Sequence, residues 1–512
     1  MILFFEQLFK KLFDKLIIEE DELKPKSKYD LNALNINICI TVPSYFSYIK
    51  RKVLEKILQK HIFQNMNINF NFNYNYDFNN NNFSVSSSKQ STFSTCTNIN
   101  NLNHSNNKIN KNKILDINLN NIKIENAPNP AVLCFQNNNS EDSISSSFSF
   151  QSCTKESNIL ILNISDDSTN ISITSITNEK KQIGNNNKNK YIKKYEVKNI
   201  SGYNFGQEDF IKNYLYQKLQ EINFNLYDNI SKSPKDLLKI QKVFEKTIKL
   251  FDTKPENKID LKKIFNNHDY TITLNEQDYI NSNTALFNKI ISSIKSILNQ
   301  SKLSEIQIDD IVLIGRASKS GYMKKILSEI FKNNKILYNK FLNTNDNNFE
   351  NDEHYLVSGA ALESMNSNLK LISKKYIFLD ICPISFGIEN SNGEVDLIIK
   401  KGNKVPITQK NFVKIYRKKD TDFVDIKICE INSDNKKVVL SCSNINGKNM
   451  KIFDKNDQNE NEFVELLFEF EIDENFNLSV FILDRQTFKR RFEFSINIDV
   501  IKDKDKDKDK IL

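Results

Sequence analysis

The sequence predicts a soluble protein of two unlike parts, an α/β region followed by an all-β sandwich, with an apolar connector between them. Three observations predict this organisation. Strand-like and helix-like runs alternate as far as about residue 373. Beyond residue 389, apolar residues alternate at period two in short runs that are separated by turn signals. Between these regions, residues 376–389 are apolar and nearly free of charge, although linkers are normally polar.

The composition of the chain argues against several classes of protein. Hydrophobic residues make up 39% and charged residues 27% of its 512 residues, which is typical of a soluble globular protein. The net charge of +8 is a mild excess and favours a solvated Lys-rich surface over a nucleic-acid partner. Seven scattered cysteines without a CxxC pair, and only four histidines, argue against a zinc site or a disulfide framework. We expect free thiols in a reducing compartment.

The first residues predict neither a signal peptide nor a membrane span. No apolar run reaches the roughly 20 residues that a span needs, and the start lacks a basic region and meets a charge at Glu6. Apolar residues recur at helical spacing from Phe5 to Leu16, which predicts an amphipathic helix for core packing in preference to membrane binding. We expect a cytoplasmic protein without a membrane partner. A location in an organelle stays open if the given N-terminus is incomplete.

Elements of the first part follow in order. Residues 35–46 predict a strand that stops at Pro43, and residues 49–63 have helical periodicity. Residues 65–121 are rich in Asn and predict a low-complexity, disordered insertion, and residues 136–157 form a second polar, Ser-rich stretch. Solvated loops explain both stretches better than recognition or aggregation does.

Regular patterns return at residues 158–165, a buried type of strand, which residues 171–176 suit as a hairpin partner. Helical patterns then cover residues 207–222, 234–250 and 284–298. Residues 310–315 predict a strand that ends in a Gly turn, and a helix follows at residues 322–331. Such a strand, turn and helix are the usual frame for a phosphate or nucleoside. A last helix is predicted at residues 354–365.

The second part reads as strands alone, at residues 395–400, 412–416, 424–430, 437–441, 463–472, 478–483 and 491–500. Their regular spacing predicts a β-sandwich. Residues 502–510 alternate Lys and Asp and have no apolar face, which predicts a frayed tail.

Seven short motifs, in order along the chain, resemble the heat shock protein 70 family of DnaK-type chaperones. Residues 41–46 resemble its TVPAYF, 205–210 its LGGEDF, 311–319 its VVLVGGSTR and 358–361 its YGAA. Residues 376–389 resemble the segment DLLLLDVTPLSLGIE that joins the two domains of the family, and residues 402–408 and 470–480 resemble two β-domain signatures. Each motif alone is weak, but seven in order are hard to obtain by chance.

The resemblance implies an actin-like ATPase fold followed by a sandwich that binds short extended peptides. The implied divisions are 1–64 for a remnant of the N-terminal lobe, 65–121 for the insertion, 122–373 for the remaining nucleotide-binding domain, 374–389 for the linker, 390–500 for the sandwich and 501–512 for the tail. The implied linker residues are Ile377, Phe378, Leu379 and Asp380. The implied peptide-binding residues are Phe412, Val413, Val424, Ile426 and Ile428, of which period two assigns only half to a pocket and the rest to the sandwich core.

The resemblance also implies a site for ATP or ADP with Mg²⁺, from which this sequence departs. The aligned cofactor-binding positions are Ser168, Gly206, Glu208, Glu245, Gly315, Ser318, Lys319 and Gly359. In the family's phosphate loop, DLGGGTFD, glycines let backbone N–H groups approach the phosphates. Ser165, Asp166 and Asp167 replace those glycines here. Each of the two carboxylates would repel a polyphosphate by roughly 1 to 4 kcal/mol at about 4 Å.

Further positions of the implied site are altered. Asn163 and Asn170 stand where family aspartates support the metal, and Ala127 stands where a Glu helps to position its water. Arg316 replaces a glycine beside the base. We therefore assign no catalytic residue and no metal site. The family's first phosphate loop has no counterpart before Thr41 and its helical lid has none after residue 500, and a truncated sequence would explain the first gap but not the altered loop.

Three hypotheses of function follow. The first is a chaperone or co-chaperone that binds unfolded or nascent polypeptides, or a partner such as an active heat shock protein 70 or a J-domain co-chaperone, with ATP hydrolysis weak or lost. The second is an active ATP-dependent folding chaperone with an unusual phosphate loop. The third is a protein-interaction module without chaperone activity. Because the connector is retained while the phosphate glycines are lost, we expect the connector to be set in one state, or to be moved by a partner and not by nucleotide.

Overall fold

The computed structural model describes residues 33–65, 75–77, 82–84, 116–127, 129–135, 156–183, 188–223, 225–265, 268–331, 352–367, 376–416, 423–431, 436–446, 463–494 and 496. The predicted N-terminal helix, most of the Asn-rich insertion, nearly all of the Ser-rich stretch and the charged tail lie outside the described residues.

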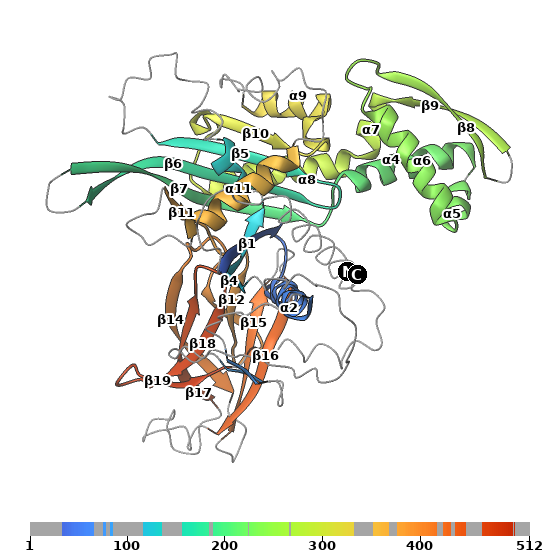
Figure 1. Ribbon diagram of the computed structural model, residues 1–512. Coiled ribbons are helices and arrows are strands. Elements are labelled where there is room, and N and C mark those ends of the chain that lie inside the picture. The colour runs from blue at the N-terminus through green and yellow to red at the C-terminus, as the bar shows by residue number, and fades with distance from the viewer. Residues whose placement is uncertain are drawn as a thin grey trace, which may run out of the picture.

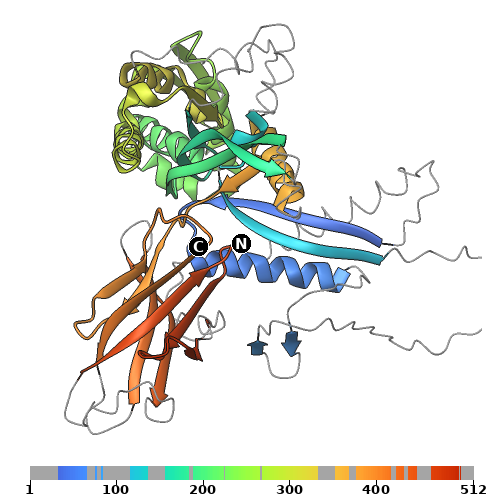
Figure 2. The same ribbon diagram turned by 90° about the vertical axis from the view of Figure 1, so that its left-hand side faces the viewer.

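An α/β part and an all-β part lie on either side of a two-stranded ribbon and one helix (Figures 1 and 2). The ribbon pairs β1 (Ala33–Pro43) with β4 (Asp116–Ala127) in parallel. Helix α2 (Tyr48–Asn65) lies beneath this ribbon, on the side of the sandwich. A short hairpin follows, formed by β2 (Asn75–Asp77) and β3 (Asn82–Ser84).

The α/β part is built on a five-stranded sheet with the order β10-β5-β6-β7-β11. Its strands are β5 (Ser157–Ile164), β6 (Thr169–Ile183), β7 (Lys188–Tyr203), β10 (Asp310–Ile314) and β11 (Tyr376–Leu379). The three central strands are antiparallel, and β10 and β11 add to the two edges in parallel. Leu160 and Leu162 pack into one core while Ile159 and Ile161 pack into another, so β5 is buried on both faces and its residues 159–162 are all apolar.

Helices cover both faces of this sheet. Helices α4 (Gln207–Ile222) and α8 (Thr284–Gln300) pack on one face, and α11 (Asp352–Ser367) with residues 131–135 packs on the other. An outer arm, visible at the side of Figure 1, contains α5 (Leu226–Ser231), α6 (Pro234–Ile248), α7 (Glu276–Ser282) and the hairpin of β8 (Glu256–Phe265) with β9 (His268–Asn275). The remaining elements are η1 (Glu305–Gln307), η2 (Ala317–Lys319) and α9 (Gly321–Ile330).

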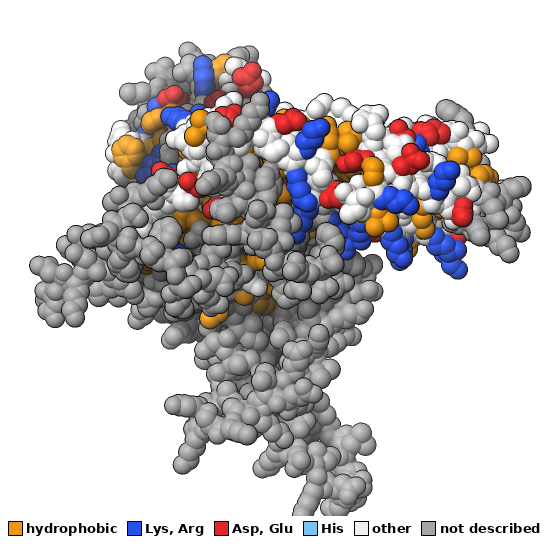
Figure 3. All heavy atoms as spheres, turned by 90° about the horizontal axis from the view of Figure 1, so that it is seen from above, with side chains coloured by type: hydrophobic (Ala, Val, Ile, Leu, Met, Phe, Trp, Pro, Cys, Tyr) orange, Lys and Arg blue, Asp and Glu red, His pale blue; other side chains and the backbone are white. Residues whose placement is uncertain are grey.

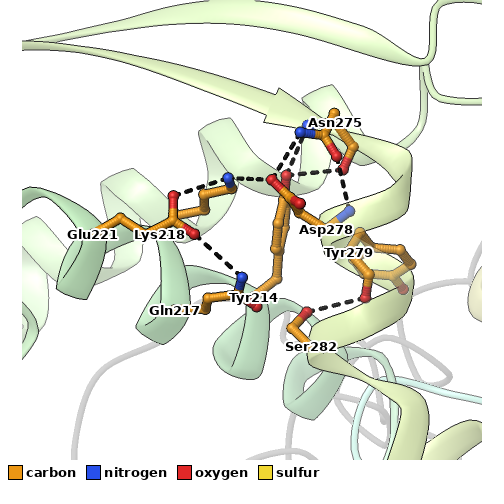
Figure 4. Close-up of polar contacts among 8 residues, drawn as sticks. All are labelled: Tyr214, Gln217, Lys218, Glu221, Asn275, Asp278, Tyr279 and Ser282. Carbon is orange, nitrogen blue, oxygen red and sulfur yellow. Dashed lines mark hydrogen bonds and ion pairs between the residues drawn. The ribbon is translucent and has the colours of Figure 1, made fainter.

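Polar contacts join α4 to α7 and to the end of β9 (Figure 4). The buried ammonium of Lys218 pairs with Asp278 and, at 3.0 Å, with Glu221. The Tyr214 hydroxyl accepts from the Asn275 amide at 2.8 Å and donates to the Asn275 carbonyl at 3.0 Å. The Asn275 side chain also caps α7 by accepting from the Asp278 amide at 2.8 Å. The arm is therefore fixed to α4 by bonds between segments about 60 residues apart.

The all-β part is a sandwich of two four-stranded sheets, which confirms the predicted sandwich. One sheet has the order β13-β12-β15-β16, from β12 (Ser385–Glu389), β13 (Val395–Ile399), β15 (Phe423–Ile431) and β16 (Lys437–Asn446). The other has the order β14-β17-β18-β19, from β14 (Ile407–Tyr416), β17 (Phe463–Ile472), β18 (Leu478–Leu483) and β19 (Arg490–Glu493). Their facing side chains form one core, with Phe468 and Phe470 at its centre.

The connector is divided between the two parts. Residues 376–379 form β11 of the first sheet, and residues 385–389 form β12 of the sandwich. Only residues 380–384 cross from one to the other. Among the described cysteines, Cys39, Cys134, Cys382, Cys429 and Cys442 are free thiols, as predicted. Within the described segments, every helix is too short or too polar to cross a lipid bilayer.

Candidate nucleotide site and interdomain junction

The altered phosphate loop, residues 165–168, is a tight turn between β5 and β6. The Ser165 amide donates to the Ser168 carbonyl at 2.9 Å, and the two hydroxyl oxygens of these serines lie 2.7 Å apart. The side chains of Asp166 and Asp167 are exposed. The loop is therefore closed on itself by hydrogen bonds, and its two carboxylates face solvent.

The N-terminus of α4 packs directly on this loop. The Gln207 amide donates to the Ser165 carbonyl at 2.8 Å, and the Glu208 amide donates to the Asp166 carbonyl at 2.9 Å. Gly206 permits this approach, because a Cβ there would lie 2.4 Å from the Ser165 carbonyl oxygen. Amides at a helix N-terminus are the groups that bind a phosphate. Here two of these amides already donate hydrogen bonds to the loop.

Negative charge gathers around the same turn. Burial, and then the carboxylates of Asp166 and Asp167, raise the pKa of Glu208 above its usual value. The same two effects, burial and the charge of Asp167, raise the pKa of the Tyr45 phenol to about 12. The electrostatic field at this point therefore opposes added negative charge, including that of a polyphosphate.

The predicted metal-supporting positions are occupied by neutral side chains with structural contacts. Asn170 accepts hydrogen bonds from both the amide and the hydroxyl of Ser44, each at 2.9 Å. Asn163 is buried, and its Oδ1 has no hydrogen-bond partner. Ala127 is buried at the end of β4. Among the described residues, no three His, Cys, Asp or Glu side chains gather closely enough to hold a metal ion.

A small cavity of about 80 Å³ lies between α6, α7 and η2. Glu245 and Lys319, two of the aligned cofactor positions, line it together with Arg316. The Arg316 guanidinium pairs with Glu245, which also pairs with Lys249 at 3.0 Å. The carboxylate that would contact a base is therefore bonded to two cations of the protein.

The other predicted cofactor positions have structural roles. Gly315 adopts φ +81° and lies so close to Ile164 that a Cβ would be 2.0 Å from its carbonyl oxygen. The Ser318 hydroxyl is buried, 2.8 Å from the Ile314 carbonyl oxygen. Gly359 lies elsewhere, where α11 crosses Pro130, and a Cβ there would be 1.9 Å from the Pro130 carbonyl oxygen. The residues present do not fit a magnesium nucleotide bound through loop amides and a metal.

The connector is docked along the edge of the α/β sheet. Tyr376–Leu379 pairs in parallel with Lys193–Glu196 of β7. The carboxylate of Asp380 accepts from the side chains of Asn126 at 3.0 Å and Asn129 at 2.8 Å, and from the Ile381 amide at 2.7 Å. Of the predicted linker residues, Ile377, Phe378 and Leu379 are half-buried in this pairing, and Asp380 is buried.

The sandwich in turn contacts the start of α2. The ring of Tyr48 is part of the sandwich core and packs edge-on against Phe386, with ring centroids 5.8 Å apart. Its amide donates to Glu430 at 2.8 Å, and its hydroxyl accepts from the Leu478 amide at 3.3 Å. Lys404 also reaches from the sandwich to Glu196 of β7, at 2.8 Å. This junction was not predicted, because nothing in a local pattern pairs positions about 380 residues apart.

The predicted peptide-binding residues are divided between core and surface. Val413, Val424, Ile426 and Ile428 are at most 1% exposed and lie in the core between the two sheets, the alternative that period two left open for part of this set. Along each of their strands, buried and exposed side chains alternate, and the apolar side chains point inward. Phe412 is 44% exposed and lies beneath the Arg485 guanidinium, 5.2 Å from its ring centroid. Tyr416 and Phe423 are also exposed.

The surface of the α/β part carries both signs of charge. Seen from above in Figure 3, Lys and Arg side chains are interspersed with Asp and Glu side chains and with apolar ones along the described arm. This distribution agrees with the small net charge of the sequence.

The fold and the altered turn define a two-domain protein, in which an α/β domain with a phosphate-loop position is joined to an antiparallel sandwich by a docked strand. The family described as Hsp70 protein matches residues 118–507, and the chain belongs to this family. A ribosome-associated molecular chaperone of Eremothecium gossypii is 23% identical over 227 residues, which cover 43% of this chain and 35% of that protein. A ribosome-associated molecular chaperone of Saccharomyces cerevisiae is 23% identical over 217 residues, which cover 41% and 34%. The chain thus spans about a third of the length of the curated relatives it matches.

Proposed function

We propose that this chain is a chaperone or co-chaperone that binds extended apolar polypeptide segments, or a partner chaperone, with little or no turnover of ATP. The observation that carries the proposal is the closed turn at residues 165–168. Its carbonyls are bonded to the amides of Gln207 and Glu208, where a nucleotide of this family would need free donors. Catalysis of phosphoryl transfer depends on positioning and charge stabilisation, and the chain supplies carboxylates at the place where cations are needed.

Equilibrium binding of labelled ATP with Mg²⁺, followed by measurement of phosphate release, tests this proposal. We expect neither binding nor release at millimolar nucleotide. The variant Arg316→Gly removes the ion pair with Glu245 but leaves the turn closed, so it too is expected to stay inactive. Stoichiometric binding with turnover by the natural chain would instead establish the alternative, an active ATP-dependent chaperone with an unusual phosphate loop.

Peptide capture is proposed for the outer face of β14 and the adjoining start of β15 in the other sheet. Phe412, Tyr416 and Phe423 expose aromatic rings there, and exposed aromatic surface on a sandwich suits an extended apolar segment. The names of the two relatives describe ribosome-associated chaperones, which makes nascent polypeptide a reasonable client class.

Fluorescence anisotropy with Leu-, Ile- and Val-rich peptides measures this capture. Phe412→Asp is expected to weaken binding about tenfold, since losing one buried aromatic contact costs more than about 1.4 kcal/mol. Gln409→Asp, an exposed change on the same strand, is the matched control. Absence of affinity for every such peptide would favour a protein-interaction module without chaperone activity.

Nucleotide-independent docking of the connector and a cytoplasmic location complete the proposal. The connector contacts named above are all made by the chain itself, through Asp380 and the strand pairing of β11. The described free thiols suit a reducing compartment.

A further inference from the structure

Buried charged side chains form a continuous group across the junction between the two parts, which we call the junction cluster. It contains four carboxylates and two cations, drawn from several places in the fold. The carboxylates are Glu125 of β4, Glu363 of α11, Asp380 of the connector and Glu430 of β15, and the cations are Arg51 of α2 and Lys123 of β4. The four acids are at most 6% exposed, Arg51 is 4% exposed, and the Lys123 side chain is 12% exposed.

One half of the cluster has one cation for two acids. The Lys123 ammonium lies 2.5 Å from Glu125 and 2.7 Å from Glu363. The second carboxylate oxygen of Glu125 is buried and has no hydrogen-bond partner. A buried carboxylate oxygen without a donor is costly when it is charged.

The other half spans the domain boundary. The Arg51 guanidinium donates to Asn126 at 2.7 Å and to the Phe46 carbonyl at 3.2 Å, so these hydrogen bonds go to neutral groups. Its positive charge attracts the carboxylates of Asp380 and Glu430 electrostatically, but neither carboxylate accepts one of these hydrogen bonds. Glu430 accepts one hydrogen bond, from the Tyr48 amide, and its other oxygen has no hydrogen-bond partner.

With all groups ionised, four negative charges face two positive charges, which leaves two buried negative charges uncompensated. Among the described residues, the other titratable groups that face the cluster are neutral in their ordinary state. They are Cys39 of β1, Tyr376 of β11 and Cys382 of the connector. Burial raises the pKa of each of these three, so they do not supply countercharge. Buried excess charge of one sign is most simply relieved by binding protons.

We propose that this junction is a proton-sensitive switch, in which docking of the sandwich against α2 and the connector takes up protons on the junction cluster. Acid then favours the docked arrangement, and alkali favours separation of the two parts. No nucleotide is required, because the driving force is hydration of the carboxylates when the junction opens.

The direction follows from the pKa of three of these acids in the docked state. Burial raises the pKa of Asp380 to about 6 and that of Glu430 to about 7, and it also raises the pKa of Glu125. A group whose pKa is higher in the docked state stabilises docking fully below its ordinary pKa, and loses that contribution as pH rises through the docked value. The docked state therefore weakens as pH rises through the range of about 6 to 7.

Limited proteolysis of the full chain by thermolysin measures docking, because β11 is protected while it is paired with β7. Cleavage within residues 376–379 is compared at about pH 6 and about pH 8.5, and each rate is divided by that of a free peptide of the same sequence. We expect the normalised rate to rise about tenfold, since one linked proton weakens docking tenfold for each pH unit between its separated and its docked pKa, and the unit from about 6 to about 7 lies in that range for Glu430. Circular dichroism at both values checks that the chain stays folded.

Glu430→Gln keeps the acceptor for the Tyr48 amide and removes one charge, so its normalised rate should rise less than about threefold. Glu125→Gln, on a different strand, should act in the same direction. Glu196→Gln is the control: it removes the partly exposed pair with Lys404, and should raise cleavage at both pH values without changing their ratio. The proposal is overturned if the natural chain shows no pH ratio, if both Gln variants keep the natural ratio, or if the natural chain unfolds as a whole at the higher pH.

Discussion

The contact between Tyr48 and the sandwich can be tested by a single substitution, Tyr48→Ala. The Tyr48 side chain belongs to α2 in the sequence, but its ring is 6% exposed within the sandwich core. Removing it deletes a buried ring from the junction and leaves α2 itself intact. We expect the two parts of the chain to separate.

The magnitude follows from the contacts of the ring. Truncating a buried aromatic side chain to Ala costs about 3 to 5 kcal/mol. Because every 1.4 kcal/mol corresponds to a factor of about ten, the docking constant should fall at least about 100-fold. Tyr48→Phe keeps the ring and removes only the hydroxyl that accepts from the Leu478 amide, which should cost about 1 to 3 kcal/mol.

Small-angle X-ray scattering is the direct assay, since separation of the two parts raises the radius of gyration. Thermolysin cleavage of the connector gives a second reading of the same event. Lys50→Ala is the matched control, because Lys50 lies on the same helix and is exposed. We expect Tyr48→Ala to separate the two parts most, Tyr48→Phe to separate them less, and Lys50→Ala to behave like the natural chain.

The reasoning is refuted if Tyr48→Ala keeps both the radius of gyration and the cleavage rate of the natural chain. Such a result would mean that strand pairing of β11 and the contacts of Asp380 hold the sandwich without the ring. A melting curve for each variant separates loss of docking from loss of folding, because α2 and the sandwich should both stay folded.

Three further outcomes are expected. Lys218→Met should lower the stability of the α/β part by about 1 to 3 kcal/mol, read by urea unfolding, because Asp278 loses its buried partner; an unchanged midpoint would contradict this. Gly359→Ala should lower the free energy of unfolding by about 1 to 3 kcal/mol in the same assay, since its Cβ would lie 1.9 Å from the Pro130 carbonyl oxygen. Gly393→Ala is the comparison: its Cβ meets no neighbour within 4 Å, so it should lower the free energy of unfolding by only about 1 kcal/mol, because of its φ of +80°. Cleavage at residues 376–379 should be equal with and without ATP, and strong protection by nucleotide would overturn nucleotide-independent docking.

Strongly periodic elements were predicted well from the sequence. Helix α4 runs over Gln207–Ile222, as its apolar spacing predicts, because Ile211, Leu215 and Leu219 form one buried stripe. Strand β7 was not predicted, because its Lys-rich sequence lacks the apolar alternation of a half-buried strand. The β8 and β9 hairpin was missed for a similar reason, since charged residues interrupt both strands.

The site was predictable only where a residue type itself decides the chemistry. Loss of loop glycines at residues 165–167 could be read directly, because only Gly lets the backbone approach a phosphate. The pair of Arg316 with Glu245 joins residues 71 apart, and no local pattern indicates it. Likewise, the sequence around Glu125 is rich in Lys and Asn and indicates a surface position, whereas the fold buries Glu125 beneath the connector.

A short piece of chain connects the altered turn to the docked sandwich. Ser44 is bonded to Asn170 beside the turn, and a few residues later Tyr48 enters the sandwich core. The position of α2 is therefore fixed at both ends of this piece by protein groups. A ligand can shift such an arrangement only by as much as its affinity differs between the docked and separated states. A ligand at the turn would first have to displace the hydrogen bonds that the amides of Gln207 and Glu208 already donate to the turn. Protons meet no such barrier, because they reach the junction cluster whenever the two parts separate.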